Sequence, residues 1–166
     1  VSSLHRTLVH QQARAKTRAC AAELTKARAK AGEDLAQRIQ KELAYLSMPS
    51  VKFVTEIVPV ESKDGFVSTG ADEVRFLISA NAGEKPGRIS KIASGGELSR
   101  IMLAMKSVLA EQDEIPTLIF DEIDTGISGR TAQMVSEKMA QTGASHQILC
   151  ITHLSQIASM ADAHFL

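Results

Sequence analysis

The chain has 166 residues, 44% of them hydrophobic and 23% charged, and its formal net charge is zero. This composition excludes an intrinsically disordered chain and allows one compact domain with a sizeable core. An aromatic content of 4% and the absence of Trp argue against a base-stacking platform for single-stranded nucleic acid. The sequence contains no run of 18 apolar residues and no signal-peptide pattern at its N-terminus, so we expect no membrane partner.

The charges are distributed unevenly along the chain. Residues 1–46 carry nine Lys/Arg and four Asp/Glu (9 − 4 = +5), whereas residues 47–166 carry ten and fifteen (10 − 15 = −5). A basic helix could face nucleic acid, although a solvated helix face is the more common explanation. Cys20 and Cys150 lack metal-ligand spacing, which favours a reducing, cytoplasmic setting. A chain that starts at Val1 rather than Met suggests part of a longer protein.

Residues 1–46 predict one long helix, because they contain no Pro, a single Gly and mostly good helix formers. An apolar stripe runs through the second half of this segment, at Leu35, Ile39, Leu43 and Leu46. We interpret the helix as the end of a coiled-coil arm that enters a globular head; a long amphipathic helix packed on its own domain is the alternative. Pro49 ends the helix.

Beyond Pro49 the apolar period changes to that of strands. Residues 51–57 alternate, residues 62–65 (Ser-Lys-Asp-Gly) predict a hairpin turn, residues 74–80 form another strand, and residues 81–88 predict a loop. Helices and short apolar strands then alternate, which predicts an α/β fold with a parallel sheet covered on both faces. The expected helices are 94–111, 131–141 and 154–160, and the expected strands are 117–120, 147–151 and the start of one at 163–166.

Three segments carry groups suited to a phosphate site at strand and helix ends. Residues 94–97 (Ser-Gly-Gly-Glu) combine a capping box with two glycines, so free N–H groups there can bind an anion; an ordinary capped helix is the alternative. The strand 117–120 runs into Asp121 and Glu122, which suit Mg²⁺ binding and activation of water, or merely face solvent. His153 follows another apolar strand and could reach a phosphate or be structural.

In combination, these segments resemble the C-terminal lobe of an ABC-type ATPase head, which has the P-loop NTPase fold. Residues 93–100 resemble the signature motif of SMC-like proteins, residues 117–122 a Walker B strand with its catalytic Glu, and residues 151–153 the switch-histidine loop. The resemblance implies a long N-terminal helix from a coiled-coil arm at 1–46 and the head lobe at 47–166.

The loop at residues 125–132 indicates which family of ABC-type ATPases the chain resembles. Ser128 stands where a general ABC protein has Asp, a departure from transporters and typical SMC proteins. This loop, Lys91-Ile92-Ala93 and residues 153–158 are similar to the RecN family of bacterial DNA-repair proteins. Ser155 departs from the Pro that the family often carries there. The resemblance is dense from about residue 76 onward and weak over residues 1–46.

The resemblance implies ATP and Mg²⁺ as cofactors and a role for each motif residue. Glu122 would be the general base, His153 would contact the γ-phosphate of its own head's nucleotide, and Asp121 would help to hold Mg²⁺. Arg100 would support the signature helix. The residues implied in binding the partner's nucleotide or forming the dimer interface are Ser94, Gly95, Gly96, Glu97, Gly126, Ile127 and Ser128.

The implied function is ATP binding and hydrolysis between two heads of a homodimer during recombinational repair of DNA double-strand breaks in the bacterial nucleoid. The sequence lacks the Gly-x₄-Gly-Lys-Ser/Thr loop that cradles phosphates. We therefore expect the chain alone to be inactive and to need an N-terminal Walker A lobe as partner. The alternatives are another SMC-like or Rad50-like head, or a non-enzymatic dimerisation or DNA-binding module.

Overall fold

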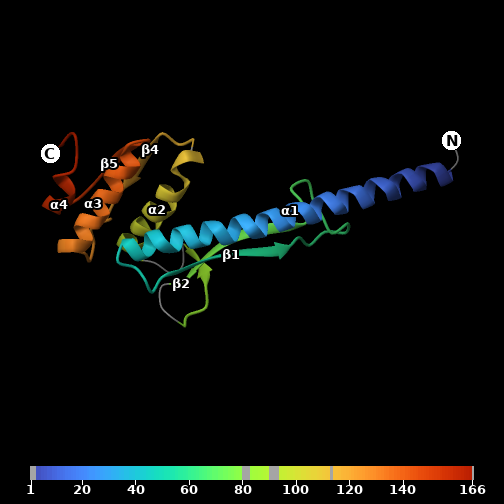
Figure 1. Ribbon diagram of the computed structural model, residues 1–166, viewed down its shortest axis with the longest axis horizontal. Coiled ribbons are helices and arrows are strands. Elements are labelled where there is room, and N and C mark those ends of the chain that lie inside the picture. Colours follow the sequence, from blue (N-terminus) through green and yellow to red (C-terminus); the bar gives the residue numbers. More distant parts are fainter. Residues whose placement is uncertain (1–2, 80–82, 90–93, 113, 166) are drawn as a thin grey trace. The chain divides into compact units, whose positions relative to one another are not determined.

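The computed structural model describes residues 3–79, 83–89, 94–112 and 114–165 (Figure 1). Lys91-Ile92-Ala93, which contribute to the RecN resemblance, lie outside these ranges. The described residues fall into two compact units, one within the ranges 1–34 and 55–76 and the other within 35–54 and 77–166. Among the described helices, none is long and apolar enough to span a membrane.

Helix α1 (Ser3–Tyr45) confirms the predicted long helix. Its C-terminus forms a Schellman motif: Met48 N–H donates to the Leu43 carbonyl (2.8 Å), and Ser47 N–H donates to the Ala44 carbonyl (3.2 Å). Ser47 itself has φ 61°, the left-handed conformation that this motif requires. The cap is complete at Met48, one residue before Pro49. The capping geometry, and not Pro49 alone, therefore ends the helix.

The first unit contains the N-terminal part of α1, the C-terminal end of β1 (Lys52–Pro59) and the N-terminal end of β2 (Asp72–Ser79). Gly65, with φ 75°, donates its N–H to the Ser62 carbonyl (3.1 Å), which confirms a turn at residues 62–65. The antiparallel pair that closes the connection between the strands is instead Val67 with Gly70, so the expected hairpin at Asp-Gly was wrong. Arg28 donates to both the side-chain and the backbone oxygens of Asp72 (2.6 and 3.1 Å), and Thr25 also donates to the Asp72 carboxylate. These contacts tie α1 to the start of β2.

Strand β3 (Gly87–Arg88) was not expected, because the Gly- and Pro-rich segment around it predicts a loop. It pairs antiparallel with β2, with Leu77 opposite Arg88 and Ile78 opposite Gly87, to give the sheet order β1-β2-β3. Two residues are too few to show an apolar period in the sequence. They form a strand because they pair with β2. The prediction of a loop was therefore wrong at Gly87 and Arg88.

The second unit contains the predicted alternation of helices and strands. Its elements are α2 (Gly95–Leu109), the 3₁₀ turn η2 (Ala110–Gln112), β4 (Thr117–Phe120), α3 (Gly129–Gly143), β5 (Gln147–Cys150) and α4 (Ser155–Ala158). β4 and β5 pair in parallel, from Thr117 opposite Gln147 to Phe120 opposite Cys150. Helix α3 packs against α2, α4 and β5 (Figure 1).

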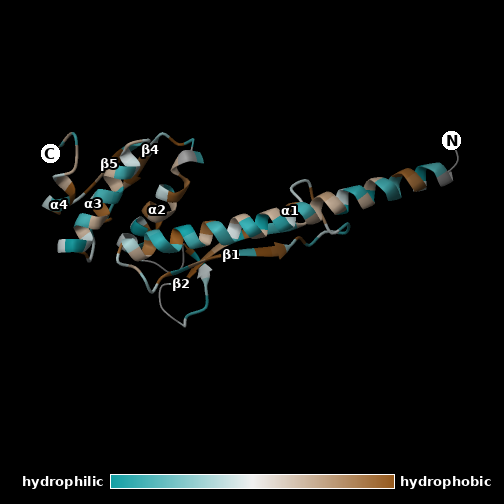
Figure 2. Cartoon of the chain, in the orientation of Figure 1, coloured by the Kyte–Doolittle hydropathy of each residue, from teal (hydrophilic) through white to brown (hydrophobic). Residues whose placement is uncertain are grey.

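The core of this unit is one continuous apolar cluster, and the strands are among its most apolar segments (Figure 2). The predicted stripe on α1 is confirmed, since Ile39, Leu43 and Leu46 are fully buried. On α2, Leu103 and Ala104 are fully buried, whereas Met102 and Met105 are only half-buried.

Two expectations for this unit were wrong. The parallel sheet is not covered on both faces: Ile119 is 69% exposed, and Leu149 and Ile151 are 44% and 57% exposed, while Leu118 and Phe120 on the opposite side are buried. Among the described residues, only the face that carries Leu118 and Phe120 is buried. Residues 163–165 also form no strand, and Leu166 lies outside the described residues.

Candidate functional site

The parallel register of β4 and β5 places two loops at the same edge of the sheet. Asp121 and Glu122 follow β4 directly, and Ile151, Thr152 and His153 follow β5. Ile151 N–H donates to the Phe120 carbonyl (3.0 Å), which continues the ladder to the very end of the strands. Ligand sites of α/β sheets lie at such carboxyl ends, so the predicted acidic and histidine segments share one edge.

The N-terminus of α2 has the predicted capping box. Ser94 is the N-cap in an extended conformation (φ −65°, ψ 163°), and the Glu97 carboxylate accepts hydrogen bonds from the Ser94 N–H (3.2 Å) and hydroxyl (3.1 Å). Ser94 and Gly95 are exposed, and Gly96 is buried. The helix therefore starts at a defined residue and presents its N-terminal end at the surface.

The two glycines at the start of α2 lie directly against the loop that follows β4. A Cβ atom on Gly96 would lie 2.8 Å from the Glu122 carbonyl oxygen and 3.0 Å from the Thr125 carbonyl oxygen. A Cβ atom on Gly95 would overlap the Glu122 carboxylate. The close approach to backbone atoms explains why position 96 needs glycine, and it brings the first two predicted segments together.

Asp121 and Glu122 are both exposed at the strand end. Glu122 has φ 56°, a left-handed conformation that costs a non-glycine residue on the order of 1 kcal/mol or more. Its N–H donates to the Asp121 Oδ1 atom (2.9 Å). The strained backbone turns the chain sharply after β4 and directs the Glu122 side chain toward the start of α2.

Two residues of α2 attach the helix to this loop. The Ser99 hydroxyl donates to the Asp121 carbonyl (2.7 Å). The buried Arg100 guanidinium donates to the carbonyls of Ile123 (3.2 Å) and Thr125 (3.0 Å). Burial lowers the pKa of Arg100, and the nearby Glu97 partly offsets this effect. The expected support of the signature helix by Arg100 thus takes the form of direct bonds to the loop after β4.

Asp124 was not singled out from the sequence, yet its carboxylate joins the loop after β4 to the loop after β5. Its side chain is buried, and its Oδ2 atom accepts hydrogen bonds from the Thr152 hydroxyl (2.6 Å) and the His153 N–H (2.7 Å). Desolvation raises its pKa, but the hydrogen bonds from Thr152 and from backbone N–H groups outweigh it and leave the pKa lowered. The available signal was a third acid two residues after Glu122.

The remaining predicted residues lie at the ends of the same loops. Gly126 has φ 74°, and Ser128 is the exposed N-cap of α3 (φ −160°, ψ 174°). His153 has an exposed side chain, while its backbone is held by Asp124. The structure therefore gathers the three predicted segments around the loop at residues 121–125.

The donor set fits a magnesium ion that is shared with phosphate. Asp121 is an exposed carboxylate, and Mg²⁺ in nucleotide sites is held by one or two carboxylates, water and phosphate oxygens. Among the described residues, no group of three or more His, Cys, Asp or Glu could form an all-protein metal site. Burial raises the pKa of the nearby Cys150 thiol to about 11, so this group stays protonated and is unsuited to act as a nucleophile.

The relatives of this chain reported below are all bacterial DNA repair proteins named RecN. No protein-family model matches the chain. The chain is 50% identical over 130 residues to DNA repair protein RecN of Treponema pallidum, which covers 76% of this chain and 23% of the relative. RecN of Bacillus subtilis is 44% identical over 156 residues (87% and 27%), and RecN of Haemophilus influenzae is 41% identical over 160 residues (95% and 28%). The chain spans about a quarter of the length of these relatives.

Solved structures with a similar fold are SMC head domains. The Smc head domain with an extended coiled coil from Pyrococcus furiosus, solved bound to the C-terminal domain of ScpA, matches 84% of this chain and 33% of its own, with 21% identity and a TM-score of 0.54. The Smc head domain with a coiled coil and joint from Pyrococcus yayanosii matches 78% and 23%, with 23% identity and a TM-score of 0.53. The chain thus has the α/β fold of an SMC-type head segment with a long N-terminal helix, and its sequence shows that it belongs to the RecN family.

Proposed function

We propose that this chain is the C-terminal lobe of an ABC-type ATPase head that binds and hydrolyses ATP between two heads during repair of DNA double-strand breaks. One observation carries the proposal: the loop after β4 is bonded both to the start of α2 and to the loop after β5. Three segments that are separate in sequence thereby form one surface of carboxylates, exposed helix N-terminus and histidine.

In the proposed reaction, Glu122 is the general base for the attacking water and His153 contacts the γ-phosphate of the nucleotide on the same head. Both side chains are exposed at the carboxyl edge of β4 and β5, as groups that meet a substrate must be. Asp121 helps to hold Mg²⁺, which supplies charge neutralisation at the phosphates. The left-handed backbone at Glu122 supports a functional role, because such strain clusters at active sites.

The partner head contributes the opposite side of the site. Ser94, Gly95 and Gly96, with Glu97 completing the cap, present the N-terminal end of α2, where N–H groups and the helix dipole favour a γ-phosphate. Gly126, Ile127 and Ser128 belong to the loop that crosses the proposed interface. Gly126 and Ser128 are exposed, so they are accessible to a second head.

A further segment of the protein is needed for the nucleotide. The chain spans about a quarter of its RecN relatives and carries no phosphate-cradling Walker A loop. The exposed apolar face formed by Ile119, Leu149 and Ile151 is suited to packing against the missing Walker A lobe. We therefore propose that the N-terminal Walker A lobe packs against this face. Without that lobe, we expect the chain alone to be inactive.

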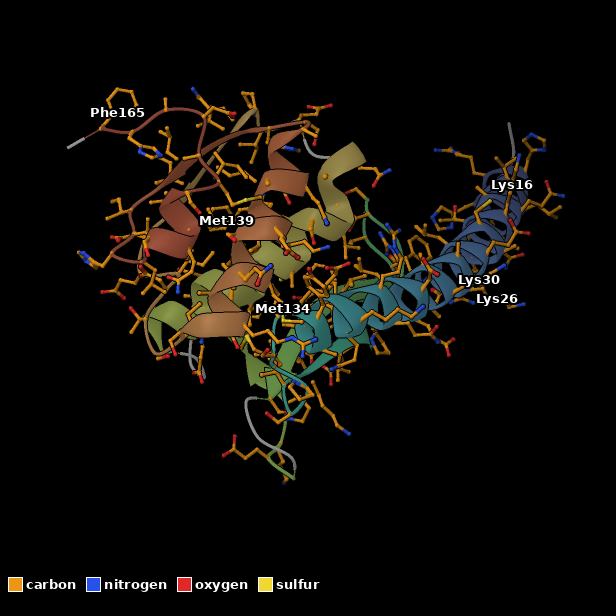
Figure 3. All side chains as sticks on the ribbon, turned by 60° about the vertical axis from the view of Figure 1, so that its left-hand side comes forward. Lys16, Lys26, Lys30, Met134, Met139 and Phe165 are labelled. Atoms are coloured by element: carbon orange, nitrogen blue, oxygen red, sulfur yellow. The ribbon has the colours of Figure 1, made fainter. Side chains whose placement is uncertain are left out.

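Helix α1 is assigned to the base of a coiled-coil arm, with residues 1–46 as arm and residues 47–166 as head. Its outer part carries exposed basic side chains, including Lys16, Lys26 and Lys30, which point away from the helix in Figure 3. DNA of the bacterial nucleoid is the partner proposed for the whole protein. The same lysines favour the second candidate, a module that binds DNA or dimerises without catalysing a reaction.

The test is ATP hydrolysis by the full-length protein, meaning this chain together with the remainder that its RecN relatives possess. We expect turnover by the unchanged protein, turnover near background for Glu122→Gln, and none by the 166-residue chain alone. Removing a general base typically costs about 10²–10⁴-fold in rate. Full turnover with Glu122→Gln would contradict the assigned base, and DNA repair that is insensitive to this substitution would favour the non-enzymatic candidate.

A further inference from the structure

The loop after β4 and the loop after β5 are joined through a single buried carboxylate, that of Asp124. The residue is only 9% exposed. The Oδ2 atom accepts two short hydrogen bonds, from the Thr152 hydroxyl (2.6 Å) and from the His153 N–H (2.7 Å). The Thr152 hydroxyl oxygen in turn accepts the Leu154 N–H (3.1 Å). Three successive residues of the turn, 152 to 154, are therefore held by one acidic side chain.

We propose that Asp124 is a positioning residue that holds the Thr152–His153 turn in place, and thereby sets the location of the His153 imidazole during ATP hydrolysis. The proposal rests on the function proposed above, in which His153 meets the γ-phosphate. It does not make Asp124 a catalytic residue, since the buried carboxylate is directed at the protein backbone and at Thr152.

The need for such a residue follows from the exposure of His153. Its imidazole is exposed, so its position depends on the backbone that carries it. That backbone is attached to β4 by the Ile151 N–H bond to the Phe120 carbonyl, and to the loop after β4 by the bond to Asp124. A displacement of about 1 Å in a reacting or orienting group can cost about 100-fold in rate.

Asp124 is itself rigidly placed. The carbonyls on either side of it, of Ile123 and Thr125, both accept hydrogen bonds from Arg100 on α2. Its own carbonyl accepts the Ile127 N–H (3.3 Å). A carboxylate anchored at both neighbours can fix another loop, and charge-assisted hydrogen bonds are about twice as strong as neutral ones. Asp124 therefore links α2, the proposed interface loop and the histidine turn.

The structure also predicts how substitutions should rank. Both donors point at the same oxygen, so Asp124→Asn can retain these two hydrogen bonds through its Oδ1 atom while it loses the negative charge. Asp124→Ala removes both bonds. Thr152→Val removes one donor and keeps the shape of the side chain, whereas Thr152→Ser keeps the hydroxyl. The rate should therefore fall more in the alanine than in the asparagine variant, and more in the valine than in the serine variant.

The experiment measures steady-state ATP hydrolysis by the full-length protein. We expect Asp124→Ala to lower kcat by about 10- to 100-fold, with KM changed by less than about 3-fold, because positioning acts on the transition state. The double variant Asp124→Ala, His153→Ala should be no slower than His153→Ala alone, since Asp124 acts through His153. Additive losses would overturn the proposal, as would an unchanged kcat in Asp124→Ala.

Thr142→Val is the matched control. Thr142 lies on α3, outside the motif segments, and its hydroxyl donates to the Lys138 carbonyl (2.9 Å). The substitution removes one threonine hydroxyl bond, as Thr152→Val does, but away from the proposed site, so its kcat should stay within about 2-fold of the unchanged protein. An equal loss of kcat in Thr142→Val and Thr152→Val would overturn the proposal.

Amide hydrogen exchange of the same proteins without nucleotide separates this proposal from the proposed function. Asp124→Ala and Thr152→Val should accelerate exchange at residues 152–154 and leave α3 protected. Faster exchange at residues 152–154, together with no ATP hydrolysis by the unchanged protein, would contradict the proposed function but support the contact between Asp124 and the histidine turn. If Asp124→Ala fails to fold, Thr152→Val decides both readouts. Unchanged exchange at residues 152–154 in Thr152→Val would overturn the proposal.

Discussion

The two glycines that begin α2 meet different kinds of atoms, although they are adjacent. A Cβ atom on Gly96 would press on the backbone carbonyls of Glu122 and Thr125, which the loop cannot move without breaking its own bonds. A Cβ atom on Gly95 would meet only the far end of the Glu122 side chain, which can rotate away. At the residue scale, glycine at position 96 is therefore required for packing, whereas the residue at position 95 limits only where the Glu122 side chain can lie.

We expect Gly96→Ala to destabilise the 166-residue chain by about 1–3 kcal/mol, the usual cost of forcing extra volume into a packed contact. Gly95→Ala should change stability little, because alanine suits a helix and the only obstruction is a flexible carboxylate. Urea unfolding midpoints of the two variants measure the difference. Equal destabilisation by both substitutions would show that the loop after β4 does not approach Gly96 as closely as the structure has it.

Motif residues such as Ser94, Glu97 and Asp121 could be located from the sequence because their spacing is itself the signal. Asp124 could not, since its importance lies in burial and in bonds to a loop 28 residues away. The strain at Glu122 was equally invisible, because a positive φ at a non-glycine residue has no marker in the sequence. The residues of the candidate site could thus be listed from the sequence, whereas the contacts that bring them together could not be predicted.

At the scale of elements, α1 and β2 are connected in the first unit by the buried Asp72 carboxylate. The hydrogen bond from Thr25 lowers the pKa of Asp72 most, and Arg28 lowers it further, while desolvation opposes them. A lowered pKa in the folded state means that Asp72 stabilises the fold above its unfolded pKa of about 3.8, and that this contribution is lost as the pH falls through the folded value.

Asp72→Asn should therefore lower the melting temperature at pH 7, and the difference from the unchanged chain should shrink as the pH falls below about 4. Thermal unfolding between pH 2 and pH 7, followed by circular dichroism, measures this convergence. Glu73→Gln is the matched neighbour, because Glu73 pairs with Arg75 on the surface, where ion pairs contribute little. A difference that stays constant from pH 7 to pH 2 would rule out titration of Asp72 as its source.

The elements themselves show why periodicity predicts some features and misses others. β4 was predicted at its observed bounds because a short apolar run between Pro116 and Asp121 has few other possibilities. β3 was missed because two residues become a strand only through pairing with β2. The apolar residues of β4 and β5 correctly indicated strands, but the expected cover on both faces was wrong, because an apolar run does not show which faces of a sheet are buried and Ile119 is exposed.

At the scale of the whole molecule, the exposed face of Ile119, Leu149 and Ile151 leads to the last prediction. Ile119 is 69% exposed in this chain, so Ile119→Asp should leave its fold intact. In a complex with the remainder of the full-length protein, the same side chain would be buried in an apolar contact. An unpaired charge there costs several kcal/mol, which corresponds to binding weakened by at least about 100-fold.

The measurement is association between the 166-residue chain and the separately produced remainder, by calorimetry or co-elution. Val67→Asp is the control, because Val67 is also an exposed apolar residue, at 46%, but belongs to the connection between β1 and β2. We expect Ile119→Asp to lose binding and Val67→Asp to keep it. If Ile119→Asp binds as tightly as the unchanged chain, the sheet face is not where the Walker A lobe docks, and the ATP site must be assembled in another way.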